Sequence, residues 1–149
     1  MKKIFSVILL AGWIGLVLFL SFQNGEDTSN TSLTFTQKIL HIFIGSNPDW
    51  GILMLWDKRF RLAAHFVLFF LYGIISMQVL RQWKKQLLAA GGISAASGIF
   101  LAVISEVGKL PIQGRHCDFS EMGLNVAGAA AGTVVVMVSV WLMNRTNQK

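Results

Sequence analysis

Four long runs of apolar residues, separated by polar segments, dominate the chain. They cover residues 4–22, 62–80, 87–105 and 124–143, and each has close to the ~20 apolar residues that a helix needs to cross a bilayer core. Because backbone groups in lipid must bond within their own segment, such runs predict helices rather than buried strands. No A-x-A cleavage site follows the first run, so we expect a retained span rather than a signal peptide. The pattern predicts an all-α integral membrane protein with four transmembrane helices in one domain, 1–149.

The segment between the first two runs, residues 23–61, contains a shorter helical pattern. Over residues 33–44, polar residues recur every three or four positions among apolar ones, which predicts an amphipathic helix. We expect residues 25–32 to be flexible, and Gly45 and Pro48 to end the helix. A helix of this kind can lie flat in the membrane interface or pack against its own spans, and the sequence leaves both arrangements open.

Composition supports a membrane protein and excludes most soluble classes. Hydrophobic residues make up 54% of the chain and charged residues only 13%, about half the ~25% of a soluble domain. The net charge of +6 would suggest a nucleic-acid partner in a soluble protein. Here the basic residues flank apolar runs, so we expect no nucleic acid. The single cysteine, Cys117, excludes an intrachain disulfide.

The charges also predict an orientation. The amino end, the loop 81–86 and the carboxyl end carry basic residues and no acid, and basic residues favour the cytoplasmic side. Both termini are therefore expected in the cytoplasm, with the loops 23–61 and 106–123 outside. All seven acidic residues fall in these two outer loops. The cytoplasmic basic residues would be Lys2, Lys3, Arg81, Lys84, Lys85, Arg145 and Lys149.

Polar residues gather at the outer ends of the last three spans. Asp118 and Glu121 have the spacing of a helix capping box, and Arg61 and His65 share a helix face. A titratable histidine inside an apolar run is costly unless it meets a partner or a wet cavity. Such a cluster either locks the helices together or forms a functional pocket, and the sequence leaves both open. Its candidate residues are Arg61, His65, Glu106, Arg115, Asp118, Glu121 and Asn125.

Small residues mark the last span as a packing helix. Gly128 and Gly132 form a small-xxx-small pair, which lets helix backbones approach closely. The pair serves either packing within the bundle or a homodimer face. The sequence therefore leaves the oligomeric state open.

Familiar enzyme motifs are absent from the sequence. It has no HExxH, no Walker loop and no GxGxxG, so we expect no metal, nucleotide or other cofactor. Two carboxylates with His65 could perform acid–base chemistry, and Arg61 with Arg115 could grip a phosphate. Whether the protein is an enzyme stays undecided, with a binding module favoured.

In order and spacing these residues resemble the VanZ-like membrane protein family over nearly the whole chain. The resemblance has three departures: Lys109 stands where Gln is common, Gln113 replaces a Pro, and Glu121 replaces the usual Asp. The residues that carry it are Ser21-Phe22-Gln23, Arg61 before His65-Phe66, Glu106, Gly114-Arg115, Asp118, Glu121, Asn125 and Gly128.

The resemblance implies a multi-pass protein of the bacterial plasma membrane. Because the family includes a protein that raises tolerance to teicoplanin, it also implies a contribution to glycopeptide tolerance. The partners expected on this basis are membrane lipids, with a lipid-linked cell-wall component or a lipoglycopeptide at the outer cluster. The alternative is an intramembrane enzyme or binding protein that acts on a lipid phosphate headgroup.

Overall fold

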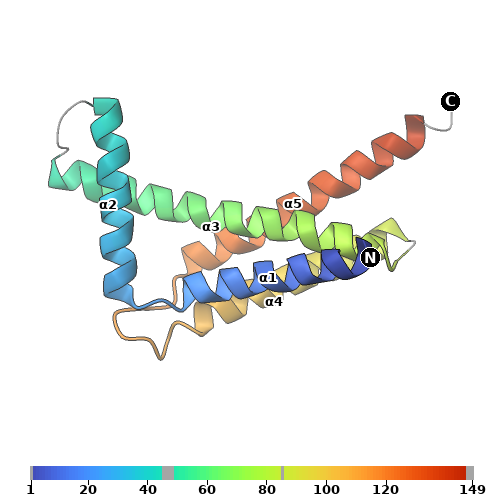
Figure 1. Cartoon of the computed structure of the whole chain (residues 1–149), viewed down its shortest axis with the longest axis horizontal. Coiled ribbons are helices and arrows are strands. Elements are labelled where there is room, and N and C mark those ends of the chain that lie inside the picture. The colour runs from blue at the N-terminus through green and yellow to red at the C-terminus, as the bar shows by residue number, and fades with distance from the viewer. Residues whose placement is uncertain (1, 45–48, 85, 147–149) are drawn as a thin grey trace.

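A computed structural model describes residues 2–44, 49–84 and 86–146, and this part of the chain forms five α-helices (Figure 1). Four of them are long and apolar enough to cross a membrane, namely α1, α3, α4 and α5. The all-helical fold with four candidate spans is confirmed. The helices are α1 (Lys2–Ser21), α2 (Gly25–Ile44), α3 (Trp50–Arg81), α4 (Leu87–Val107) and α5 (Phe119–Thr146).

Helices α2 and α3 begin well before the residues at which the sequence pattern predicted their starts. The expectation that residues 25–32 are flexible is wrong, because α2 begins at Gly25. Its start is stabilised by Asn24, whose side-chain oxygen accepts a hydrogen bond from the backbone N–H of Glu26 (3.4 Å). The expected stop signals Gly45 and Pro48 lie outside the described residues.

Helix α3 begins at Trp50 rather than near Leu62, and its 32 residues span about 48 Å, well beyond a ~30 Å bilayer core. Residues 52–61 contain neither Gly nor Pro, so nothing in them breaks the helix. Their Asp57 is buried and accepts hydrogen bonds from α2. The amino-terminal part of α3 is therefore a helix that packs against α2 rather than a loop.

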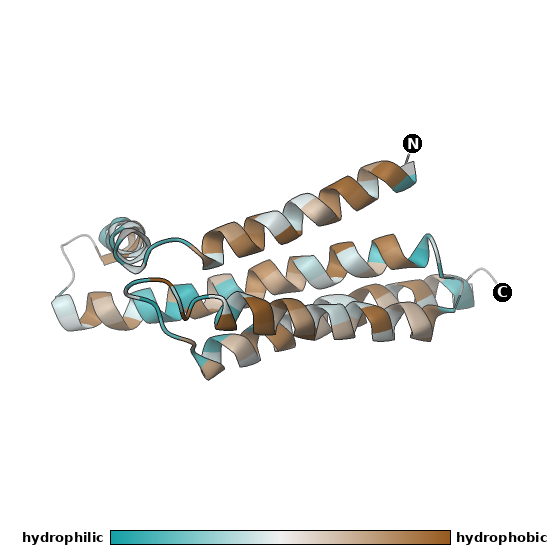
Figure 2. Cartoon of the chain, turned by 90° about the horizontal axis from the view of Figure 1, so that it is seen from below, coloured by the Kyte–Doolittle hydropathy of each residue, from teal (hydrophilic) through white to brown (hydrophobic). Residues whose placement is uncertain are grey.

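The four apolar helices run side by side and alternate in direction, whereas α2 lies across their axes (Figure 1). The start of α1, the end of α5 and the α3–α4 connection lie at one end of the bundle, and the α1–α2 turn and the α4–α5 loop lie at the other. Hydrophobic residues lie along the four bundle helices, and hydrophilic residues gather in the connections at the ends of the bundle (Figure 2). The polar residues of both expected outer loops thus share one end.

Glycines bring α3 and α5 into close contact. A Cβ at Gly128 would collide with the Phe66 carbonyl oxygen, and one at Gly132 with the Phe70 carbonyl oxygen. Both glycines are buried within the chain. The small-xxx-small pair therefore packs the bundle, and no room is left at it for a second copy.

Candidate functional site

Charged side chains are buried where α4, the α4–α5 loop and α5 meet. Glu106 lies in the last turn of α4, Lys109 follows in the loop, and Glu121 lies in the first turn of α5. The Lys109 Nζ is 2.7 Å from Glu106 Oε1 and 2.7 Å from Glu121 Oε2. Glu106 and Lys109 are 0% and 1% exposed. The ammonium between the two carboxylates neutralises charges whose burial would otherwise be very costly.

His65 of α3 joins this group through both ring nitrogens. Its Nε2 is 3.2 Å from Glu121 Oε2, and its Nδ1 is 3.2 Å from Asn125 Oδ1. The Asn125 amide is oriented by its Nδ2, which donates to Glu106 Oε1 at 3.4 Å. Both ring nitrogens of His65 therefore have an oxygen partner within the chain.

Arg61 lies one helical turn further out on α3 and is the least committed of these groups. Its Nη2 is 3.6 Å from Glu121 Oε1, longer than the ~2.7–2.9 Å of a charge-assisted hydrogen bond. The side chain is 33% exposed. Within the described part of the chain, most N–H donors of the Arg61 guanidinium thus have no close acceptor. We refer to Arg61, His65, Glu106, Lys109, Glu121 and Asn125 as the rim cluster.

Arg115 lies beside the rim cluster but holds a different part of the chain. Its Nε donates to the Gln23 carbonyl oxygen (3.1 Å) and its Nη2 to Thr28 Oγ1 (2.7 Å). Gly114, with φ at +73°, makes the turn that aims it. Burial lowers the pKa of the Arg115 guanidinium below its ordinary value, and the nearby Arg61 charge lowers it further. The two hydrogen bonds of Arg115 tie the α4–α5 loop to the α1–α2 turn. The guanidinium remains a cation despite its lowered pKa.

Asp118 caps α5, and only half of the expected capping box forms. Its Oδ1 accepts a hydrogen bond from the backbone N–H of Ser120 (2.7 Å). The reciprocal hydrogen bond of a capping box, from the Asp118 backbone N–H to the Glu121 carboxylate, does not form, because this N–H donates to Glu106 Oε2 instead (3.4 Å). Glu121 is held by the Lys109 ammonium, and a charged partner is stronger than a backbone N–H.

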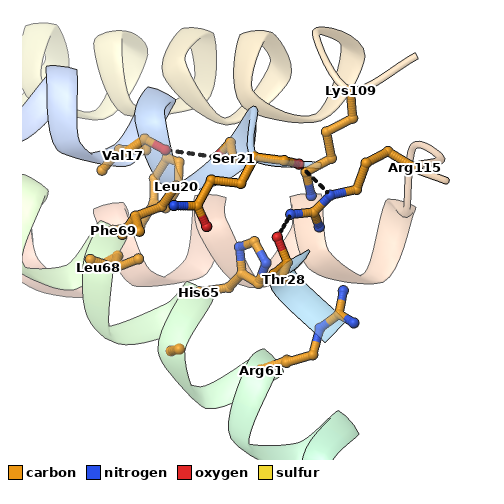
Figure 3. A pocket seen from close by; sticks show the side chains of 12 residues that line it. Val17, Leu20, Ser21, Thr28, Arg61, His65, Leu68, Phe69, Lys109 and Arg115 are labelled. Carbon is orange, nitrogen blue, oxygen red and sulfur yellow. Dashed lines mark hydrogen bonds between the residues drawn. The ribbon is translucent and has the colours of Figure 1, made fainter. Parts of the chain in front are cut away.

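A cavity of about 170 Å³ lies between α1 and α3 beside the rim cluster (Figure 3). In the figure, Arg61 and His65 from α3 and Lys109 and Arg115 from the loop approach one region from different directions. None of the described residues that line the cavity is a carboxylate. The cavity thus has a cationic end, and an apolar end lined by Val17, Leu20, Leu68 and Phe69.

A second, polar cavity of about 130 Å³ shares Arg61, Lys109 and Arg115 with the first. It is lined by Asp118 and Glu121 as well as by Arg61, Lys109 and Arg115, so its charge is nearly balanced. An anion is therefore better accommodated in the first cavity than in the second.

Three groups of the rim cluster have the chemistry of metal ligands. One ligand atom each from His65, Glu106 and Glu121 lies within 4.8 Å of the others. The Lys109 ammonium, 2.7 Å from both carboxylates, takes the position that a cation between them would need. The carboxylates are thus satisfied by the chain's own ammonium.

These features define a multi-pass helical membrane protein with a buried ion-pair cluster at one end of its bundle. The family model described as VanZ/LLP1 matches residues 5–142. The chain belongs to this family. Comparisons with curated proteins and with solved structures find no match.

The structure brings five of the seven candidate residues into the rim cluster, and it places Arg115 and Asp118 next to it. Lys109 was not among the candidates, although it joins both carboxylates. Its position three residues after Glu106 was a signal in the sequence, since residues at this spacing meet on one side of a helix or helical turn. The contact with Glu121 had no such signal.

Proposed function

We propose that this VanZ/LLP1 protein binds the anionic headgroup of a membrane amphiphile, a phosphate above all, in the cavity between α1 and α3. The observation that carries the proposal is the division of this cavity into a cationic and an apolar end. A phosphate at the cationic end would meet the free donors of Arg61, and guanidinium groups suit phosphate oxygens through paired hydrogen bonds. The first carbons of the chain would then lie against Val17, Leu20 and Phe69.

The size of the cavity limits what enters it. About 170 Å³ is smaller than the ~300–1,000 Å³ of pockets that enclose drug-sized ligands. It holds a phosphate group and a short part of the attached chain, while the rest of the amphiphile would stay in the bilayer. The proposal therefore concerns recognition of a headgroup and not enclosure of a whole lipid.

Binding is favoured over catalysis by the state of the acid–base groups. Both ring nitrogens of His65 face acceptors, and Lys109 is bonded to two carboxylates. A general base needs a nitrogen or oxygen free to take a proton from the reacting group. Turnover of a phospholipid is the outcome that would favour the enzyme alternative.

The orientation proposed with this function places the rim cluster at the outer face of the bacterial plasma membrane. The basic residues Arg81, Lys84 and Arg145 belong to the opposite end of the bundle, which supports this orientation by the positive-inside rule. Cysteine substitution of exposed Gln113 in a Cys117→Ser background tests it. A membrane-impermeant thiol reagent should label this cysteine in intact cells, and labelling only after lysis would reverse the orientation.

The binding experiment uses purified protein in detergent micelles and dihexanoyl phosphatidic acid as the probe. Wild type should bind it, and Arg61→Gln should weaken binding about tenfold or more, which corresponds to ~1.4 kcal/mol or more. Arg59→Gln is the matched control, because Arg59 lies two residues away, is exposed and lines neither cavity described above. Equal affinities of the two variants would refute the site. Two further probes separate the contributions of headgroup charge and acyl chains to binding. Dihexanoyl phosphatidylcholine keeps the chains without a net headgroup charge, and inorganic phosphate keeps the charge without the chains.

Family membership supports a second, finer proposal, a contribution to teicoplanin tolerance through the same cavity. A lipid-linked wall component or the lipoglycopeptide itself would present the anionic group. Cells that express wild type, Arg61→Gln, Glu121→Gln or Arg59→Gln are compared by their minimal inhibitory concentration of teicoplanin, with membrane abundance of each protein measured by immunoblot. Cells with Arg61→Gln or Glu121→Gln should lose tolerance, and cells with Arg59→Gln should keep it. If Arg61→Gln and Glu121→Gln cells keep their tolerance at equal protein abundance, the cavity has no part in resistance.

A further inference from the structure

Helix α2 uses one of its faces to pack on the outer part of α3. The hydroxyl groups of Ser32 and Thr36 both donate to Asp57 Oδ1, the latter at 3.2 Å. Leu40, one turn further along the same face, is 5% exposed. The spacing of four residues places all three on one side of the helix. This face is therefore satisfied within the chain.

A second face of α2 is apolar and exposed. Phe35, Ile42 and Phe43 are 58%, 78% and 83% exposed. Phe35 and Ile42 are seven residues apart, which is two helical turns, so they point to the same side. Phe43 is seven residues after Thr36, so it lies at the edge of the apolar face that adjoins the packing on α3. Large apolar side chains gathered at this exposure require a partner, whereas scattered single residues would not.

The third face of α2 is polar. Thr34, Gln37, Lys38 and His41 are exposed on it and, with Ile42 at its edge, line one shallow depression. At ~100° per residue, Gln37 lies about 140° around the helix from Ile42. Lys38, four residues before Ile42, lies at the border between the two faces, whereas Gln37 points well away from Ile42 and Phe35. This division of exposed apolar and polar residues is that of a helix that lies in a membrane interface.

The position of α2 in the molecule fits the same arrangement. The helix runs across the bundle axis at the end where α1 finishes (Figure 1), and it is seen end-on in Figure 2. The end of α1 exposes Phe19, Leu20 and Phe22 just before α2 begins. The lipid-facing apolar surface of α1 therefore continues towards α2.

We propose that the exposed apolar face of α2 is inserted into the headgroup layer of the same bilayer that the four spans cross. The patch consists of three side chains of ~150–250 Å² each, only partly exposed, which is about half of the ~800 Å² per partner of a standard protein interface. Such a patch is small for a second copy of the chain but suits insertion of ~5–10 Å into the boundary between headgroups and acyl chains.

This insertion has a consequence for the cavity. Thr28 of α2 accepts a hydrogen bond from Arg115, and Arg115 lines the cationic end of the cavity. A helix seated in the headgroup layer therefore holds that cationic end at the depth of lipid phosphates. The inference about α2 itself does not depend on the proposed binding function.

The test measures collision of spin labels with oxygen, which dissolves in lipid, and with a water-soluble nickel chelate. Single cysteines replace Ile42 or Gln37 in a Cys117→Ser background, and the labelled full-length protein is reconstituted in phosphatidylcholine–phosphatidylglycerol vesicles. Both positions are exposed, so neither label should disturb the packing on α3. A third label at Phe43 repeats the measurement on the apolar face.

Labels at Ile42 and Phe43 should collide mainly with oxygen, and the label at Gln37 mainly with the nickel chelate, with a ratio that differs several-fold between the faces. Equal nickel accessibility at Ile42 and Gln37 would overturn the proposal, because both faces would then be in water. Shielding of Ile42 from both reagents would also overturn it and would point to a protein partner on this face.

Discussion

The middle of the bundle and the rim cluster both bury polar groups, but of different kinds. In the middle, Ser94 bonds Ser76 (2.6 Å) and Thr133 (2.9 Å), and the latter two also donate to carbonyls of their own helices. At the rim, each charge depends on partners from another part of the chain. The hydroxyl groups of Ser76 and Thr133 have acceptors on their own helices, whereas Lys109, Glu106 and Glu121 each have a partner that only the assembled fold brings near.

The comparison supports a function at the rim. Close glycine contacts and uncharged hydroxyl groups already join α3, α4 and α5 in the middle of the bundle. An ion-pair cluster costs desolvation energy and is weak evidence for stability by itself. The rim cluster borders a cavity, and this difference from the middle of the bundle is the one on which the proposed binding function rests. The following predictions test this difference between the two regions.

The largest effect is expected from Lys109→Met, which keeps the length of the side chain but removes the ammonium. Glu106 and Glu121 would then face each other without their shared cation, and unfolding free energy should fall by about 3–5 kcal/mol. The midpoint of thermal unfolding in detergent micelles measures the loss. Lys38→Met, at an exposed position on α2, is the control and should leave the midpoint nearly unchanged. A small loss at Lys109 would mean that His65 and Arg61 suffice for the carboxylates.

The next effect is expected when Zn²⁺ is added to the Lys109→Met protein. Removal of the ammonium opens the space between His65, Glu106 and Glu121, whose ligand atoms lie within 4.8 Å of one another. A metal at 100 times its dissociation constant stabilises the folded state by ~2.7 kcal/mol. The unfolding midpoint of the variant should rise with Zn²⁺, while that of wild type should not. An equal response of both proteins would place the metal elsewhere.

Gly132→Ala tests the middle of the bundle. Its methyl group would collide with the Phe70 carbonyl oxygen of α3, so the helices must separate, at a cost of about 1–3 kcal/mol. Gly92→Ala is the matched control, because a Cβ there meets nothing within 4 Å and alanine favours the helix. The two unfolding midpoints are compared, and a midpoint of Gly132→Ala equal to that of Gly92→Ala would contradict the close contact.

The smallest effect is expected from Ser94→Ala in the hydroxyl network. Ser76 and Thr133 keep the carbonyls of their own helices as acceptors, so the loss should be near the ~0.6 kcal/mol average of hydrogen bonds between membrane helices. The same thermal measurement checks it. A loss as large as that of Lys109→Met would show that the two regions do not differ as described.

Much of the fold followed from local patterns, whereas most of the errors concern contacts between distant parts of the chain. Hydropathy predicted the four spans but not the extension of α3 to Trp50, because the partner that accommodates Asp57 lies on α2. The polar start of α2 was mistaken for a flexible segment because its cap, Asn24, was not recognised. In the site, five of the seven candidates lie in the rim cluster, and Lys109 was missed because one of its two carboxylates is distant in sequence.

The sequence by itself determined the class of protein, the number of candidate spans and the supply of charged groups at one end of the bundle. These properties are local, because a lipid-crossing helix needs only a sufficient run of apolar residues with its own backbone hydrogen bonds. Only the tertiary structure decided that Lys109 lies between Glu106 and Glu121, that Arg115 binds the α1–α2 turn, and that a cavity lies between α1 and α3. Pairing of charges and the shape of a cavity depend on distances between helices, and those distances are set by contacts far apart in the chain, such as Gly132 against Phe70.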